Sequence, residues 1–515
     1  MSSSPVSSLP RLDASEADFA AFRALLATQE YDVAPICART ESPAIYDFRM
    51  RKHARHDAVP ENGLDVLIAL FLDCYSLPLN EVERLLGAGS SALLVRLGLA
   101  MELDGKLTGT VLLYPNEGIY MISDRPGFSG TGLLLFESTT DLVYPAITNS
   151  GRTFLSTMPF VPGQRFLELC SGTGVAALMA ARSGAAQAWA VDITARSTHF
   201  AAFNALLNGL PNVSALQGDL FAPVEGEQFD CIVAHPPYVP AATTEVIYRD
   251  GGEDGEQITR AILARVSEFL APGGIFHCTC IISARPEAPA SLRVREMLGA
   301  AADSFDMVLL GNGATDLATH FTKQLLKATD DKVPDIVSQL RYFQELAVQR
   351  VEFCTIILRR HDGRRKGGTI AVQRDGQTRW AEAEWLLRLQ ALLGMGEHGL
   401  DRLLNARPRL SPLAQFSLTY GVDPDAEERW VPREGEVTVT YPFPGRVSVN
   451  AGDAAFLASC TGERTFAELL REIQEEGGIP ADLDPRQFMH TMVPLVAEGV
   501  LETDLLPFPR HFTSS

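Results

Sequence analysis

The sequence between residues 151 and 360 alternates short apolar segments with segments of helical periodicity, and this alternation limits the possible folds most strongly. Neighbouring parallel strands need a long crossover connection, which a helix usually provides, so the alternation predicts an α/β layer. The expected strands are RFLELC (165–170), AQAWAVD (186–192), VSALQGD (213–219), DCIVAH (230–235), GIFHCTCII (274–282), FDMVLLG (305–311) and VEFCTIILRR (351–360).

Three of the helices expected between these strands span residues 175–182, 195–208 and 256–270. Asp254 precedes the third of them at the spacing of a helix cap, and we expect that role for its carboxylate. Together the segments predict a Rossmann-like α/β domain with a seven-stranded, mostly parallel sheet.

The chain has 515 residues, too many for a single hydrophobic core, so we expect several domains. On both sides of the α/β region, helical and strand-like segments occur in the combination found in winged-helix folds. The expected parts are a disordered lead (1–14), a helical, winged-helix-like N-terminal domain (15–125), the α/β domain (126–370, with 126–160 covering its pocket), a helical linker (371–430) and a winged-helix-like C-terminal domain (431–515).

The charge of the chain is unfavourable for binding nucleic acid. There are 44 basic and 64 acidic residues, which gives a formal net charge of −20, and such a surface repels phosphate backbones. The third N-terminal helix (90–98) carries one basic residue, so packing or substrate recognition is favoured over DNA reading. The basic runs 49–56 and 358–368 are expected to be solvated, the second as a turn between strands.

The cysteine pattern and the N-terminus indicate a cytoplasmic protein. Eight cysteines are scattered through apolar segments, as expected for reduced thiols, and the motif HCTC (277–280) is expected to be a buried strand rather than a metal site. The N-terminus lacks the apolar core of a signal peptide, and the apolar stretch near residue 64 is too short to span a bilayer. The sequence does not indicate an oligomeric state.

The segment FLELCSGTGVAALMAAR (166–182) has the order strand, glycine-containing turn, helix. Gly172 and Gly174, near Cys170, let a ligand approach the backbone at the positive end of the helix. The third glycine of a pyrophosphate cradle is absent. Glu168 would repel a pyrophosphate, whereas its carboxylate suits a cationic amino-acid group. The two glycines could also simply shape the turn.

Two further strands end in acidic residues. Asp192 ends the second strand, and its carboxylate can accept hydrogen bonds from both hydroxyls of a ribose. Asp219, followed by Leu220 and Phe221, suits the amino group and ring face of an adenine. Either aspartate could instead cap a helix. Three acidic strand ends without a phosphate cradle predict S-adenosylmethionine as the ligand.

These segments resemble motifs I, II and III of the class I methyltransferases. His235-Pro236-Pro237-Tyr238 is similar to the (Asn/Asp/Ser)-Pro-Pro-(Tyr/Phe/Trp) motif of the amino-methylating branch. The likeness is greatest to the HemK/PrmC-type protein-glutamine methyltransferases, in which a Gly-Gly-x-Asp-Gly stretch follows the motif, as in YRDGGEDGEQITRAI (248–262). The resemblance covers about residues 150–285. Separately, GDAAFLASCTGERTFAELLREI near the C-terminus weakly resembles small peptide-binding modules of the PqqD type.

In the resembling family, the Pro-Pro turn directs a backbone carbonyl to the acceptor nitrogen, the first side chain accepts a second hydrogen bond, and the aromatic ring packs on the planar group. This chain departs from the pattern at the first position, His235. A neutral imidazole accepts one hydrogen bond and can take a proton. His235 could therefore replace the asparagine as an acceptor, act as a general base, or be a structural histidine.

The remaining candidate residues are assigned to the substrate. Tyr144, in the segment 141–154 that covers the pocket in related enzymes, is expected to contact substrate or cofactor or to be structural; Arg249, Asp250 and Glu253 are expected at the far side. The function expected is S-adenosylmethionine-dependent N-methylation of a protein or peptide side chain or of an amino-acid-like small molecule. The alternatives are methylation of an exocyclic amine of RNA or DNA, and a catalytically inactive S-adenosylmethionine-binding regulator.

Overall fold

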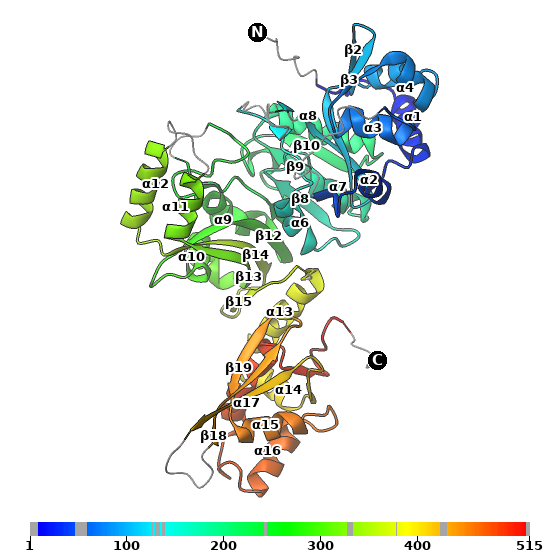
Figure 1. Ribbon diagram of the computed structural model, residues 1–515. Coiled ribbons are helices and arrows are strands. Elements are labelled where there is room, and N and C mark those ends of the chain that lie inside the picture. The colour runs from blue at the N-terminus through cyan, green and yellow to red at the C-terminus, as the bar shows by residue number, and fades with distance from the viewer. Residues whose placement is uncertain are drawn as a thin grey trace. The chain divides into compact units, whose positions relative to one another are not determined.

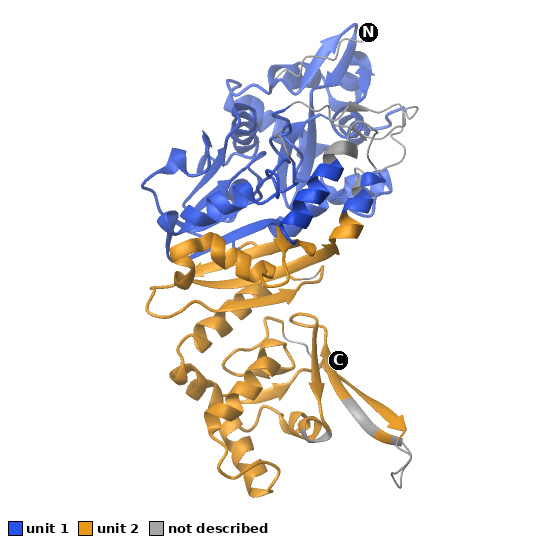
Figure 2. Cartoon of the chain, turned by 90° about the vertical axis from the view of Figure 1, so that its left-hand side faces the viewer, with its two compact units in different colours: residues 1–155, 159–281, 321–347 blue, residues 156–158, 282–320, 348–515 orange. Residues whose placement is uncertain are grey.

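The computed structural model describes residues 9–46, 59–125, 127–128, 134–135, 140–241, 245–326, 333–376, 378–422 and 430–510, and the statements below concern these ranges. The chain divides into two compact units, which Figure 2 shows in two colours. Unit 1 comprises residues 1–155, 159–281 and 321–347, and unit 2 comprises residues 156–158, 282–320 and 348–515. The predicted boundary near residue 125 does not separate units, because the N-terminal helices belong to the same unit as the first strands of the α/β layer.

Unit 1 contains a parallel sheet with the order β10-β9-β8-β11-β12 (Figure 1). The chain enters this sheet at β8, runs to the edge at β10, and returns to β11 on the other side of β8. The order therefore reverses between β8 and β11, where a crevice forms at the carboxyl ends of the strands in open α/β sheets. The strands are β8 (Arg165–Leu169), β9 (Gln187–Asp192), β10 (Val213–Gln217), β11 (Phe229–Ala234) and β12 (Leu270–Ala284), of which residues 282–284 belong to unit 2.

Three helices connect these strands: α7 (Val175–Arg182), α8 (Ala195–Leu207) and α9 (Gln257–Phe269). They agree with the predicted ranges to within one residue at each end. Helix α9 begins without a side-chain cap, and the Asp254 carboxylate accepts a hydrogen bond from the Glu256 amide at 2.9 Å just before it. Asp254 therefore orders the turn that precedes the helix.

Three more strands lie in unit 2, in the order β14-β13-β15, with β13 antiparallel to β14 and parallel to β15. The predicted count of seven strands is not confirmed, since five strands of this sheet lie in unit 1 and three in unit 2. The basic run 358–368 was expected to be a solvated turn. One of its residues is not solvated in this way, because Arg365 forms an ion pair with the buried carboxylate of Asp306. The strands are β13 (Phe305–Asp316), β14 (Arg350–Arg360) and β15 (Thr369–Gln373).

The described N-terminal part of unit 1 is mostly helical and ends in the hairpin of a three-stranded sheet β1-β3-β2; its winged-helix identity stays a prediction. The lead is shorter than expected: Pro10 is buried and the Arg11 amide donates to the Leu97 carbonyl at 2.9 Å. Residues 1–8 and 49–56 lie outside the described residues. The elements are α1 (Glu16–Thr28), α2 (Val33–Thr40), α3 (Gly63–Phe71), β1 (Ser76–Pro78), α4 (Leu79–Leu86), α5 (Ser90–Arg96), β2 (Ala100–Leu103) and β3 (Lys106–Gly109).

A second hairpin, β4 (Val111–Asn116) with β5 (Ile119–Asp124), follows this sheet, and every residue of β4 is buried. Its two-residue turn has positive φ angles at Glu117 (48°) and Gly118 (79°). Positive φ at both residues matches the right-handed twist of the two flanking strands. Residues 126, 129–133 and 136–139 of the predicted pocket-covering segment 126–160 lie outside the described residues; its described elements are β6 (Gly127–Phe128), β7 (Leu134–Leu135) and α6 (Asn149–Ser156).

The prediction of a helical linker over 371–430 is wrong in its second half. Strand β17 pairs antiparallel with β18, and β16 pairs with β20, so this segment is part of the C-terminal fold. Within the described ranges, no helix combines the length and the apolar character needed to cross a membrane. The remaining elements are α10 (Ala290–Leu298), α11 (Leu317–Leu325), α12 (Val333–Glu345), α13 (Trp380–Leu393), α14 (Glu397–Leu404), β16 (Pro408–Leu410), β17 (Gln415–Val422), β18 (Trp430–Val439), β19 (Gly445–Val449), α15 (Ala451–Ser459), α16 (Phe466–Glu475), α17 (Pro485–Ala497) and β20 (Leu501–Thr503).

Candidate active site

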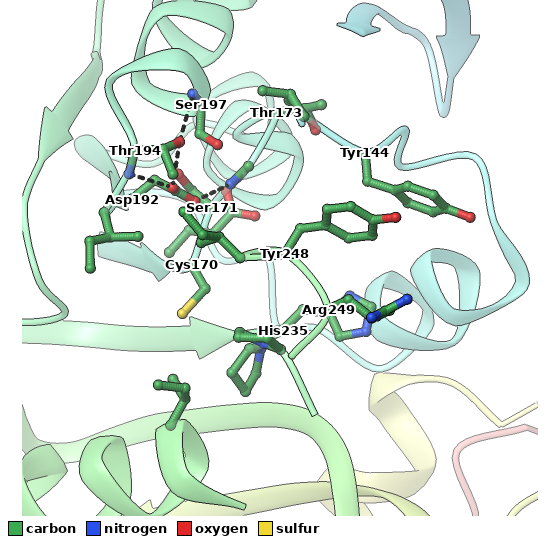
Figure 3. A pocket seen from close by; sticks show the side chains of 18 of the residues that line it. Tyr144, Cys170, Ser171, Thr173, Asp192, Thr194, Ser197, His235, Tyr248 and Arg249 are labelled. Carbon is green, nitrogen blue, oxygen red and sulfur yellow. Dashed lines mark hydrogen bonds between the residues drawn. The ribbon is translucent and has the colours of Figure 1, made fainter. Parts of the chain in front are cut away.

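A cavity of about 560 Å³ lies in unit 1 at the carboxyl ends of β8, β9, β10 and β11 (Figure 3). Its volume is within the range of about 300–1,000 Å³ that is usual for small-molecule and cofactor sites. The sequence-predicted site residues line this cavity with three exceptions, which are Gly174, Phe221 and Glu253. Segments that are far apart in sequence therefore meet at the point where the strand order reverses.

The loop between β8 and α7 requires left-handed backbone at three residues: Cys170 (φ 53°), Gly172 (52°) and Gly174 (77°). Gly172 lines the cavity, and a Cβ there would meet no atom within 4 Å, so its backbone borders open space. Gly174 instead faces helix α8, where a Cβ would lie 3.0 Å from the Cβ of Ala201. The second glycine thus brings the loop close to the helix and does not line the ligand cavity.

The carboxylate of Asp192 is fixed at the end of β9. Its Oδ2 accepts a hydrogen bond from the Gly172 amide at 2.9 Å, and its Oδ1 accepts from the amide and the hydroxyl of Thr194 at 3.0 and 3.1 Å (Figure 3). A carboxylate can accept about four hydrogen bonds. Because Asp192 lines the cavity and is half-buried, one more hydrogen-bond donor of a ligand can be satisfied there.

Glu168 lies deeper in the cavity wall and is almost fully buried. Its Oε2 accepts a hydrogen bond from the Ala177 amide in the first turn of α7 at 2.9 Å. Burial raises the pKa of this carboxyl to about 8, because the charged form loses hydration. The protonated form of Glu168 is therefore favoured at neutral pH.

In the turn after β10, one residue that was predicted to contact the cofactor lies away from the cavity. Asp219 and Leu220 line the cavity, but the ring of Phe221 is stacked on Phe269 with centroids 4.2 Å apart and is buried in the core. Leu220 has a left-handed backbone (φ 47°), which bends the chain between the cavity and the core. Phe221 therefore stabilises the turn through its packing in the core and does not contact the cavity.

The turn His235-Pro236-Pro237-Tyr238 follows β11 and lines the cavity. The His235 ring is stacked between two aromatic rings, with centroid distances of 5.0 Å to Phe154 and 5.6 Å to Tyr238. Phe154, the last residue of the segment 141–154, was not among the site residues predicted from the sequence.

The imidazole of His235 is neutral at physiological pH. Burial lowers its pKa to about 4, because the imidazolium cation loses hydration there. Its Nε2 is buried and has no hydrogen-bond partner among the residues that the structure describes. Burial raises the pKa of the Tyr238 phenol, and interaction with the Ser150 side chain opposes this shift.

The mouth of the cavity carries a pair of stacked rings, Tyr144 and Tyr248, whose centroids lie 4.9 Å apart (Figure 3). Tyr248 was not predicted, although it directly precedes the predicted Arg249. The Asp250 carboxylate is buried and accepts hydrogen bonds from the Arg249 side chain and the Val246 amide, both at 2.8 Å, so it holds this turn together.

Glu253 is exposed and does not line the cavity, so the predicted contact with substrate is not supported at this position. The two cysteines of the HCTC motif, Cys278 and Cys280, are fully buried in β12, as the strand prediction states.

Comparison with known proteins matches residues 145–299 to the family model of the methyltransferase small domain. The chain is 28% identical over 158 residues to the release factor glutamine methyltransferase of Thermodesulfovibrio yellowstonii (28% of this chain, 55% of the relative). It is 37% identical over 128 residues to the ribosomal protein uL3 glutamine methyltransferase of Bradyrhizobium diazoefficiens (22% of this chain, 40% of the relative). The chain thus spans about half the length of these relatives. The matches confirm the resemblance indicated by the motifs.

The residues of the cavity fit S-adenosylmethionine. The Asp192 carboxylate retains acceptor capacity for a ribose hydroxyl, and Glu168 is a buried acid that can balance a positive charge.

Proposed function

We propose that this chain, whose residues 145–299 form a methyltransferase small domain with S-adenosylmethionine as its cofactor, methylates a side-chain nitrogen of a protein. One observation supports the proposal most strongly. The turn His235–Tyr238 borders the same cavity as Asp192 and Glu168, so an acceptor group at the turn would lie beside the cofactor.

We assign the hydrogen-bond acceptor role to His235. A pKa of about 4 makes this imidazole a weak base at physiological pH, which disfavours the general-base interpretation. The buried, unpartnered Nε2 also disfavours a purely structural role, because an unsatisfied buried polar atom costs about 1–3 kcal/mol. A hydrogen bond from the acceptor nitrogen would satisfy that atom.

The surrounding residues orient the acceptor. Pro236 and Pro237 fix the φ angles of the turn and hence the direction of its carbonyl groups. The Tyr238 ring lies beside His235 and lines the cavity, where it can pack against a planar group. S-adenosylmethionine, when bound, supplies an electrophilic methyl group on its sulfonium. Holding the nitrogen in line with that methyl is the main contribution that the protein needs to make, and the proton that the nitrogen loses on methylation leaves to solvent.

A neutral acceptor nitrogen suits this site better than a charged one. A lysine ammonium would have to give a proton, at a pKa near 10.4, to a group with a much lower pKa. A carboxamide is uncharged and planar and can donate its N–H groups to His235 and to a turn carbonyl. The relatives' names specify glutamine, so a glutamine amide of a protein is the first candidate.

The proposal is tested by transfer of labelled methyl groups into a native extract separated into protein, RNA and small-molecule fractions. We expect label in the protein fraction, dependent on the purified chain. Label confined to RNA would contradict the assignment of the acceptor. Tight cofactor binding without label in any fraction would contradict catalysis and favour a regulatory protein.

The role of His235 gives a specific prediction. His235→Phe keeps a ring between Phe154 and Tyr238 but removes both nitrogens, so turnover should fall by about 10–100-fold because the acceptor loses one orienting hydrogen bond. His235→Asn should keep at least about a third of the activity, because the asparagine side-chain oxygen can accept the same hydrogen bond as the imidazole nitrogen. S-adenosylhomocysteine affinity, measured by calorimetry, should be unchanged in both. Full activity of the phenylalanine variant would make His235 structural.

The raised pKa of the Glu168 carboxyl leads us to expect that the affinity for the cofactor depends on pH. Below its pKa of about 8 the carboxyl is neutral, and it must lose its proton to balance the charge of the cofactor. Affinity should therefore rise by up to about tenfold per pH unit between about pH 6 and 8, and then level off. Glu168→Gln, which is neutral throughout, should bind more weakly and without this rise. Identical pH profiles of the two proteins in a calorimetric titration would contradict the role of Glu168.

A further inference from the structure

Helix α8 is joined to the hairpin β4–β5 by two asparagines one helical turn apart. The Asn208 side chain accepts from the Tyr120 amide at 2.8 Å and donates to the Tyr120 carbonyl at 2.7 Å. The Asn204 side chain does the same with Ile122, at 2.8 and 3.2 Å. Each amide side chain thus pairs with one residue of β5 as a neighbouring strand would.

The two asparagines differ in one contact. Asn204 Nδ2 also donates to the carbonyl oxygen of Thr173 at 3.0 Å, whereas Asn208 Nδ2 donates to the Asn204 carbonyl within the helix at 2.8 Å. Thr173 belongs to the loop between β8 and α7, is almost fully buried, and lines the cavity. Asn204 itself is fully buried, so its amide has no water to bond instead.

The other strand of the hairpin reaches the wall of the cavity through Tyr114. The Tyr114 hydroxyl, in β4, accepts a hydrogen bond from the amide of Ala146 at 2.8 Å, and Ala146 lines the cavity. The same hydroxyl interacts with the Thr173 side chain, which lowers the pKa of the phenol against the effect of burial. Tyr114 is fully buried, so these interactions are made in the core.

A third link runs from the end of β5. The Asp124 carboxylate accepts from the Val143 amide at 2.7 Å and pairs with Arg196 in the first turn of α8. Val143 lines the cavity next to Tyr144. The hairpin therefore holds both the cofactor loop and the wall that carries the mouth of the cavity.

We propose that Asn204 is a positioning residue for the cofactor, which fixes the loop 170–174 through the Thr173 carbonyl while the β4–β5 hairpin supports it from behind. The inference rests on the proposed function only in taking S-adenosylmethionine as the ligand of this loop. The hairpin N-terminal to the methyltransferase small domain is accordingly part of the cofactor site.

The chain supplies a matched pair of variants for the test. Asn204→Ala and Asn208→Ala each remove one side-chain bridge to β5, so both should lower the melting temperature. Only Asn204→Ala releases Thr173, so the Kd for S-adenosylhomocysteine should rise by about tenfold in that variant and by less than about twofold in Asn208→Ala. Equal changes in Kd, or a lower melting temperature of Asn204→Ala at unchanged Kd, would overturn the proposal.

Hydrogen exchange of the cofactor-free proteins gives a readout independent of binding. Backbone amides of residues 170–174 should exchange faster in Asn204→Ala than in Asn208→Ala, and equal rates would also overturn the proposal. If Asn204→Ala does not fold, Tyr114→Phe replaces it, since it removes the hydroxyl that interacts with the Thr173 side chain and accepts from the Ala146 amide; unchanged Kd and exchange would then overturn the proposal. Failure of the wild-type chain to bind S-adenosylhomocysteine would count against the proposed function, while the exchange comparison still tests Asn204.

Discussion

Asp192→Ala is expected to weaken S-adenosylmethionine binding by at least about 100-fold, because charge-assisted hydrogen bonds contribute roughly 1.5–3 kcal/mol each. The substitution removes the acceptor for the ribose and also releases the Gly172 amide and Thr194, which the carboxylate holds at 2.9–3.1 Å. The cofactor loop and the ribose contact are therefore lost together. Calorimetric titration with the cofactor measures the effect.

Asp316→Ala is the matched control for this variant. The Asp316 carboxylate also accepts a hydrogen bond from a backbone amide, that of Thr319 at 2.8 Å, but it is exposed and belongs to unit 2. Its removal should leave the Kd unchanged. If Asp192→Ala bound the cofactor as tightly as the wild-type chain does, the assignment of the cofactor site would be wrong.

Tyr238→Ala is expected to lower turnover by at least about 100-fold, because a small misplacement of a reacting group costs a rate factor of that size. The variant removes the ring that packs beside His235 and lines the cavity, where it can pack against the acceptor group. Cofactor affinity should stay within about threefold of wild type, since the ring lies at the acceptor turn. Steady-state kinetics with a labelled acceptor, combined with calorimetry, separates the two effects.

Tyr238→Phe is the companion variant, since it keeps the ring and removes only the hydroxyl that interacts with the Ser150 side chain. It should retain most of the activity. Loss of cofactor binding in Tyr238→Ala, or full turnover in that variant, would contradict the role of the ring in orienting the acceptor.

Local sequence patterns predicted the elements that build the site. Strands β8 and β11 and helix α7 were predicted to within one residue, because each has a local periodicity and a clear turn at its end. The partners of a strand are set by distant segments, and for that reason β17 was taken as part of a helical linker although it pairs with β18.

Individual site residues were predicted where a strand end fixes their position, as for Asp192 and His235. Phe221 was wrongly assigned to the cofactor, because the left-handed turn at Leu220 places its ring in the core. Phe154 and Tyr248 were missed, since only the tertiary fold brings their rings to the cavity. The contact of Asn204 with Thr173 crosses 31 residues and leaves no local signal.

The identity of the methylated atom in the labelled product tests the central claim most directly. Labelled protein from the extract would be divided between mild base, which releases methyl esters as methanol, and acid hydrolysis, which releases methylamine from an N-methyl amide. Side-chain amide methylation predicts label that is stable to base and recovered as methylamine after acid. Label released as methanol, or found only in RNA, would contradict the account.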